Sequence, residues 1–167
     1  MIRLVGICGS IVGLALAPSS LASARSSAAH ALAAAPQDRV STCTIREPGS
    51  AVVRRWAGGC HRGLGDGHGA GPMRLNDEEG VFAGRASNGR PISGVLTLPD
   101  GGFFLLAPEN PHPPPYTDAA AWASDLAFRD AFAGAAAAAR AYQAAGNTAS
   151  ARYYVTLRRH LIEGQPE

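Results

Sequence analysis

Two successive segments, WAGGCHRGLGDGHG (56–69) and VFAGRASNGRPISGVLTLPDGG (81–102), decide the fold, because in each an aromatic residue is followed by recurring glycines. Self-similarity of this kind is typical of a structure built from repeated units. Within the second segment, Asn88-Gly89 separates two runs of apolar and small residues and supplies the positive φ that a tight reversal needs. The segments therefore predict one β-hairpin each in a small antiparallel sheet.

The spacing of these residues resembles the MORN repeat (membrane occupation and recognition nexus), whose pattern is Tyr-x-Gly, a glycine five residues on, Gly-x-Gly and a Pro-Asp-Gly turn. The first unit has Trp in place of Tyr, and the second has lost one residue and one glycine, with Ser93 near the missing position. The matching positions are Trp56, Gly58, Gly63, Gly67 and Gly69, then Phe82, Gly84, Gly89, Gly94 and Gly101. Glycines inside the predicted strands indicate sharp bends or close backbone approach. The resemblance covers less than a third of the chain and implies contact with proteins or lipid headgroups; the alternative is a glycine-rich β-meander without family relation.

Residues 1–24 have the organisation of a secretory signal peptide. Arg3 precedes an apolar run over 4–17, and Ala22-Ser-Ala24 is a small-residue cleavage pattern. The run is too short to span a hydrocarbon core of ~30 Å as a permanent helix. We expect cleavage after Ala24 and a periplasmic or secreted protein, with a second site at 33–35 or an uncleaved anchor as the alternatives.

The segment after the signal, residues 25–41, is small, polar and aperiodic, so it is predicted to be disordered. The rest of the chain carries little net charge. All fifteen basic residues are arginine, and without residues 1–24, which hold one arginine and no acid, the net charge falls from +2 to +1. A nucleic-acid partner is not expected, because no basic stripe is present.

Lipid binding is expected to be weak or absent. A basic residue near an anionic membrane contributes only about 1 kcal/mol. The repeat region offers five arginines, of which at most three can share one surface because side chains alternate along a strand; they are Arg54, Arg55, Arg62, Arg85 and Arg90.

Cys43 and Cys60 remain once Cys8 is removed with the signal. An even number of cysteines in an oxidising compartment predicts a disulfide, which would stabilise a sheet of this size by about 3 kcal/mol. Two free thiols or an interchain bridge are the alternatives. Redox catalysis is not expected, because Cys-x-x-Cys is absent.

The run from Cys60 to His68 gathers the residue types of a metal site. Three convergent ligands could be His61, Asp66 and His68 if the turn folds back on itself. The alternative is a set of polar residues on an exposed hairpin loop, and the acidic run 77–79 is likewise expected to be a solvated loop. The chain has no lysine for a phosphate-binding loop and no G-x-S-x-G motif, so neither catalysis nor a cofactor is predicted.

The proline-rich residues 108–116 predict a stiff spacer, with recognition by a proline-binding domain as the alternative. Thr117-Asp118 offers an N-cap, and Gly146-Asn147 a stop, for a long helix; a second helix is expected over 148–162. The short connection makes the helices antiparallel neighbours, similar to one helical unit of a tetratricopeptide (TPR) protein. A single unit cannot bury its apolar face alone.

Helical spacing assigns faces to this hairpin. The first helix is expected to turn inward Trp122, Leu126, Phe128, Phe132, Ala136, Ala139 and Tyr142, and to leave outside Asp125, Arg129, Asp130 and Arg140. The second should turn inward Tyr154, Leu157 and Leu161. The hairpin holds more large side chains than one two-helix face can hide, so partner binding is predicted for Trp122, Phe128, Phe132, Tyr142, Tyr153 and Tyr154.

The sequence thus predicts an α+β protein: a signal peptide (1–24), a disordered segment (25–41), a MORN-like β domain (42–107), a linker (108–116) and a helical hairpin (117–163). We expect a non-catalytic exported protein that contacts an envelope protein, a second copy of itself or a membrane surface. The alternatives are a small metal- or glycan-binding envelope protein using His61, Asp66 and His68, and a purely structural accessory domain.

Overall fold

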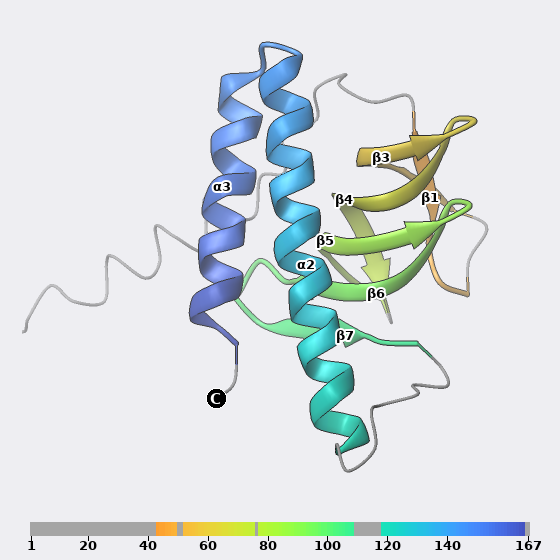
Figure 1. Cartoon of the computed structure of the whole chain (residues 1–167), viewed down its shortest axis with the longest axis vertical. Helices are drawn as coiled ribbons and strands as arrows, with labels where there is room; N and C mark the ends of the chain where they lie inside the picture. Colours follow the sequence, from red (N-terminus) through yellow and green to blue (C-terminus); the bar gives the residue numbers. More distant parts are fainter. Residues whose placement is uncertain (1–42, 50–51, 76, 109–117, 166–167) are drawn as a thin grey trace, which may run out of the picture.

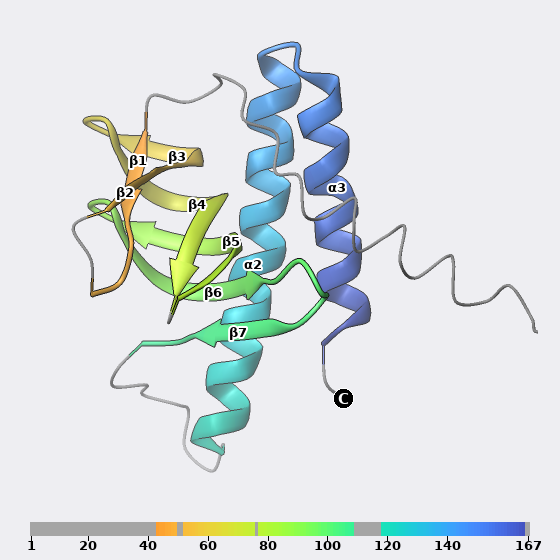
Figure 2. The same ribbon diagram turned by 180° about the vertical axis from the view of Figure 1, so that it is seen from behind.

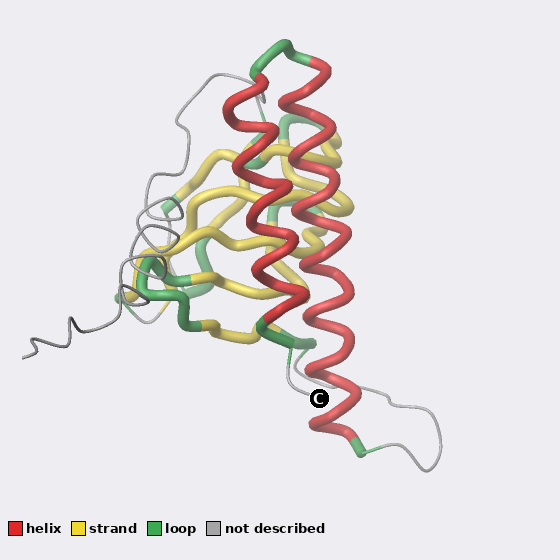
Figure 3. The backbone as a smooth tube through the Cα atoms, turned by 90° about the vertical axis from the view of Figure 1, so that its left-hand side faces the viewer, coloured by secondary structure: helices red, strands yellow, loops and turns green. Residues whose placement is uncertain are grey.

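The chain forms an α+β structure in which a seven-stranded, mostly antiparallel sheet is covered by two C-terminal helices (Figure 1; Figure 3). The computed structural model describes residues 43–49, 52–75, 77–108 and 118–165. The predicted fold class is confirmed. The signal peptide, the segment 25–41 and most of the proline-rich linker lie outside the described residues.

The strands follow one another along the chain as β1 (Thr44–Arg46), β2 (Val53–Arg55), β3 (Ala57–His61), β4 (Leu64–Leu75), β5 (Glu78–Ser87), β6 (Arg90–Thr97) and β7 (Phe103–Leu106). Their order in the sheet is β2-β1-β4-β5-β6-β7, and β3 also pairs with β4. Neighbours are antiparallel except β1 and β4, which pair in parallel at Thr44 and Leu64. The β1–β2 ribbon lies at the side of the sheet away from the helices (Figure 2).

The two repeat segments form the predicted hairpins, β3–β4 and β5–β6. Asn88 and Gly89 make the second reversal with φ values of 48° and 74°, as a type I′ turn requires. A third hairpin joins β6 to β7. The acidic run 77–79 is only partly a loop, because Glu78 and Glu79 already belong to β5 and pair with β4.

The helices are α2 (Ala119–Ala144) and α3 (Thr148–Glu163). Asp118 caps α2, since its carboxylate accepts hydrogen bonds of 2.9 Å from two backbone N–H groups of the first turn. Asn147 caps α3 by accepting from the Ser150 N–H at 2.9 Å. Both predicted helices are present, with ends within one or two residues of the expected positions. Asp118 is itself the cap of α2, not an acid within its first turn, and the hairpin packs on the sheet.

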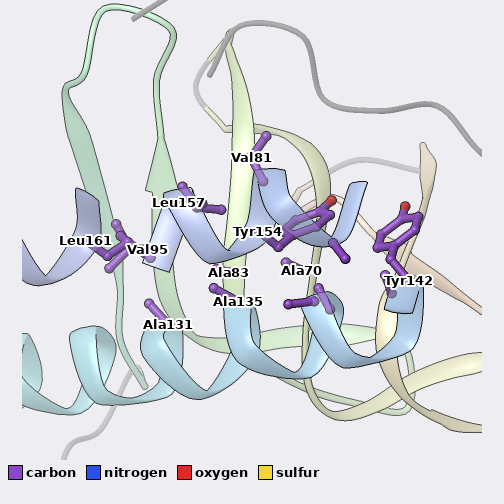
Figure 4. Packing of buried hydrophobic residues seen from close by; sticks show 14 of the residues in the cluster. Ala70, Val81, Ala83, Val95, Ala131, Ala135, Tyr142, Tyr154, Leu157 and Leu161 are labelled. Atoms are coloured by element: carbon purple, nitrogen blue, oxygen red, sulfur yellow. The ribbon is translucent and has the colours of Figure 1, made fainter. Parts of the chain in front are cut away.

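Small residues form much of the contact between α2 and the sheet (Figure 4). The helix contributes Ala127, Ala131, Ala135 and Ala138, and the sheet contributes Ala57, Ala70 and Ala83. At the closest approach, a Cβ on Gly134 would lie only 2.8 Å from the Gly84 carbonyl oxygen and would also overlap the Gly69 carbonyl. From α3, Tyr154, Leu157 and Leu161 complete the same core. The predicted β domain and hairpin therefore share one core.

A second buried cluster lies on the other face of the sheet and is built around the two repeat aromatics. Trp56 and Phe82 are fully buried and stack with their ring centroids 6.2 Å apart. A Cβ on Gly69 would come within 2.5 Å of the indole, and one on Gly84 within 2.6 Å of the Phe82 ring. The recurring glycines thus make room for the aromatic of their own unit.

Cys43 and Cys60 form a disulfide pair with their Cα atoms 5.9 Å apart, as predicted. Cys43 directly precedes β1 and Cys60 lies in β3. The pair therefore ties the β1–β2 ribbon, whose Ile45 shares a buried cluster with Trp56, to the first repeat hairpin.

The predicted faces of α2 need two corrections. Of the residues expected to turn inward, Phe128, Ala139 and Tyr142 are buried, but Trp122, Leu126, Phe132 and Ala136 are only half-buried, because the helix packs mainly through Ala127, Ala131, Ala135 and Ala138.

Asp130 was expected outside, but it is buried with 6 % of its surface exposed. The side chains of His68, Arg85 and Ser93, on three different strands, contact the Asp130 carboxylate and allow it to be buried between helix and sheet. The other three charged residues are exposed as predicted, and the inward positions of α3 are confirmed.

Candidate functional site

Four polar side chains meet where α2 crosses the sheet: a carboxylate, an imidazole, a guanidinium and a hydroxyl group. His68, Arg85 and Ser93 are in register across β4, β5 and β6, because His68 pairs with Arg85 and Arg85 with Ser93. Residues directly opposite one another in neighbouring strands project from the same face of the sheet. Asp130 reaches this row from α2.

The carboxylate of Asp130 is the centre of the cluster. His68 Nε2 lies 3.1 Å from Oδ1, Arg85 Nε lies 3.6 Å from Oδ2, and the Ser93 hydroxyl donates to Oδ2. Ser93 is fully buried, whereas the side chains of His68 and Arg85 are 40 % and 45 % exposed. Burying an unpartnered carboxylate is costly, so these three contacts are what permits Asp130 to lie under the helix.

The arrangement contains serine, histidine and aspartate but does not activate a nucleophile. In a catalytic triad the imidazole lies between hydroxyl and carboxylate, so that it can take the hydroxyl proton. Here the carboxylate lies between the hydroxyl and the imidazole, and Ser93 is shielded from solvent. The geometry instead fixes the position of α2 along the sheet.

The three candidate metal ligands are not brought together. The His61 side chain is exposed at the end of β3, and Asp66 accepts a hydrogen bond of 3.3 Å from the Asn88 N–H. His68 is directed to Asp130. In the parts of the chain that the structure describes, no three His, Cys, Asp or Glu side chains are placed to hold a metal ion.

A second group of charged side chains holds the β1–β2 ribbon. Glu47 is buried and binds Arg54 Nε at 2.6 Å and the Arg74 backbone N–H at 2.9 Å. Glu79 joins the same group through Arg54 and Arg74, at 3.5 and 3.1 Å. Because Glu79 is exposed, the buried Glu47 contacts contribute most to holding the ribbon.

The aromatic residues predicted to bind a partner are largely used inside the fold. Phe128, Tyr142 and Tyr154 are buried, and Trp122, Phe132 and Tyr153 are half-buried. Tyr154 stacks on Tyr142 with ring centroids 5.3 Å apart. Burial raises the pKa of Tyr153 to about 12 and raises that of Tyr154 well above its usual value. Packing on the sheet therefore buries apolar surface of the two helices that the hairpin could not bury by itself.

The exposed large hydrophobic side chains lie elsewhere. In the described ranges they are Val52, Leu64, Phe104, Leu105, Val155 and Ile162. Two of them belong to β7 and two to α3. The apolar run FFLL at 103–106 is the sequence feature from which the strand β7 could have been predicted. None of the helices described is both long and apolar enough to cross a membrane.

Comparison of the whole chain with protein-family models, with curated proteins and with solved structures found no significant match. The MORN and TPR resemblances therefore stay predictions.

Proposed function

We propose that this is a non-catalytic exported protein that contacts another envelope protein through the edge strand β7. The observation that carries the proposal is the exposure of this strand. β7 is the last strand in the described sheet order and pairs only with β6. Its four residues carry no charge, and Phe104 and Leu105 are 36 % and 44 % exposed.

An edge of this kind is a template for strand pairing. Natural sheets commonly blunt exposed edges with charged residues or proline, and β7 has neither between Phe103 and Leu106. Phe104 is in register with Leu96 and Leu105 with Val95, so the two exposed side chains lie on opposite faces. A partner strand added to β7 would gain main-chain hydrogen bonds and an apolar contact on each face.

Three sequence features support export and protein contact. Residues 1–24 have the pattern of a cleaved signal peptide. The pairing of Cys43 with Cys60 suits an oxidising compartment. The MORN resemblance of residues 56–102 implies a contact module. Mass analysis of the N-terminus of protein from the native envelope should show cleavage after Ala24; full-length protein in the cytoplasm would contradict export.

The contact is tested by placing a charge on the edge. Leu105→Lys should abolish photo-crosslinking of the full chain to its envelope partner, with the crosslinking amino acid at position 106. Leu64→Lys is the matched control, because Leu64 is 40 % exposed but lies at the start of β4. Adducts that survive Leu105→Lys, or that both variants remove equally, would refute β7 as the contact edge.

A further inference from the structure

The outward stripe of α3 combines arginine and aliphatic side chains at regular spacing. Arg152, Val155, Arg159 and Ile162 are separated by three, four and three residues, which places them along one side of a helix. All four are exposed, Val155 and Ile162 by 54 % and 47 %. None of them is among the buried positions of the same helix, which are Ser150, Ala151, Tyr154, Leu157 and Leu161.

The stripe is also positively charged. Arg158 adds a third arginine beside it, and Glu163 is the only acidic residue of α3. The ion pairs found within the described ranges involve none of these three arginines. A chain whose overall net charge is only +2 therefore concentrates three arginines on one 16-residue helix.

We propose that this stripe binds an acidic amphipathic helix of a partner protein. The three–four–three spacing is that of the seam between two packed helices, where successive positions meet the partner. Carboxylates of the partner would lie against Arg152 and Arg159, and its aliphatic side chains against Val155 and Ile162. This surface is separate from β7, so it adds a second contact of different chemistry.

Charge selects this occupant over a second copy of the chain. Two α3 helices would bring six arginines and two glutamates to one seam, and like charges on facing helices are unfavourable. A membrane surface fits less well for another reason. Helices that lie in a membrane interface insert a broad apolar face, whereas Tyr154, Leu157 and Leu161 are already buried in the core.

The probe is a synthetic acidic peptide of about three heptads, with leucine at the seam and glutamate beside it. Anisotropy titration with the chain from residue 25 should give a dissociation constant in the tens of micromolar. The double variant Arg152→Glu/Arg159→Glu should weaken binding at least about tenfold. A matched peptide with lysine in place of glutamate should bind the double variant and not the original chain.

Two controls separate this proposal from the function proposed above. Leu105→Lys should leave peptide binding unchanged, since β7 is not part of the stripe. Circular dichroism should show the same helix content in all variants, because the substituted arginines are exposed. The proposal is overturned if the chain binds both peptides with equal affinity, or if it binds neither peptide. So does co-flotation with phosphatidylglycerol vesicles that the acidic peptide does not displace, or a dimer in sedimentation that the double variant dissociates.

Discussion

Gly134→Ala tests how closely α2 approaches the sheet. In an isolated helix this change would stabilise by about 1 kcal/mol, because alanine has the higher helix propensity. In this structure the new methyl group would overlap backbone atoms of two strands, with the Gly84 carbonyl oxygen only 2.8 Å away. The Gly69 carbonyl oxygen and the Gly84 backbone nitrogen would lie closer still. Ordinary contact needs roughly 3.5 Å, so the helix must move by about 1 Å.

The magnitude follows from these opposing effects. Overpacking costs about 1 to 3 kcal/mol, and a value near the upper end applies because paired strands yield less than a side chain. Asp130 lies one turn before Gly134 on the same face, so the movement also lengthens its bond to Ser93, worth about 1 kcal/mol. Once the gain in propensity of about 1 kcal/mol is subtracted, we expect a net loss of about 3 kcal/mol.

Urea unfolding of the chain from residue 25, followed by circular dichroism, measures this loss as a lower midpoint. Ala137→Gly is the matched control on the same helix and should lose about 1 kcal/mol, chiefly through propensity because Ala137 is only half-buried. A Gly134→Ala protein as stable as the original chain, or more stable, would refute the close approach of helix and sheet.

Three further outcomes are expected. Asp118→Ala removes the α2 cap and should lower the free energy of unfolding by about 1 kcal/mol, measured in urea; an unchanged midpoint would show that the cap is dispensable. Reduction of the Cys43–Cys60 pair should cost about 3 kcal/mol, and mass labelling without reductant should find neither thiol; labelled Cys43 and Cys60 in native protein would exclude the bridge. Burial raises the pKa of Tyr153 to about 12 and raises that of Tyr154 as well. Because these folded-state values lie above the unfolded value of about 10, the associated stability is complete below about pH 10 and is lost as pH rises toward 12. Absorbance at 295 nm should therefore report the last tyrosines ionising together with loss of helical dichroism, and ionisation of all tyrosines near pH 10 in folded protein would contradict their burial.

Features with a local cause could be predicted from the sequence. Asn88-Gly89 carries its turn geometry in two residues, and Asp118 and Asn147 cap their helices through their own side chains. The glycines of the repeat were correctly linked to close approach, because a glycine in a strand weakens it unless space is needed.

The polar cluster could not be predicted in this way. The helical spacing of the larger apolar residues predicts Asp130 on the outer face. The partners that make its burial possible are distant in the sequence: His68 is 62 residues away and Ser93 is 37. No local pattern encodes their convergence, which depends on the register of β4, β5 and β6 and on the position of α2.

The alanine and glycine lining between sheet and helices has a consequence for the order in which the chain emerges. Whether from a ribosome or through a membrane pore, the strands appear before α2 and α3, which complete the core only at the end. Until then one face of the sheet is bare. This face is lined by Ala57, Ala70 and Ala83 together with Val81 and Val95. It offers less apolar side-chain surface during this interval than a face of leucine or phenylalanine would, and exposed apolar surface is what makes incomplete folds aggregate. The small residues that allow the helices to pack closely therefore also reduce the risk of aggregation before α2 and α3 are in place.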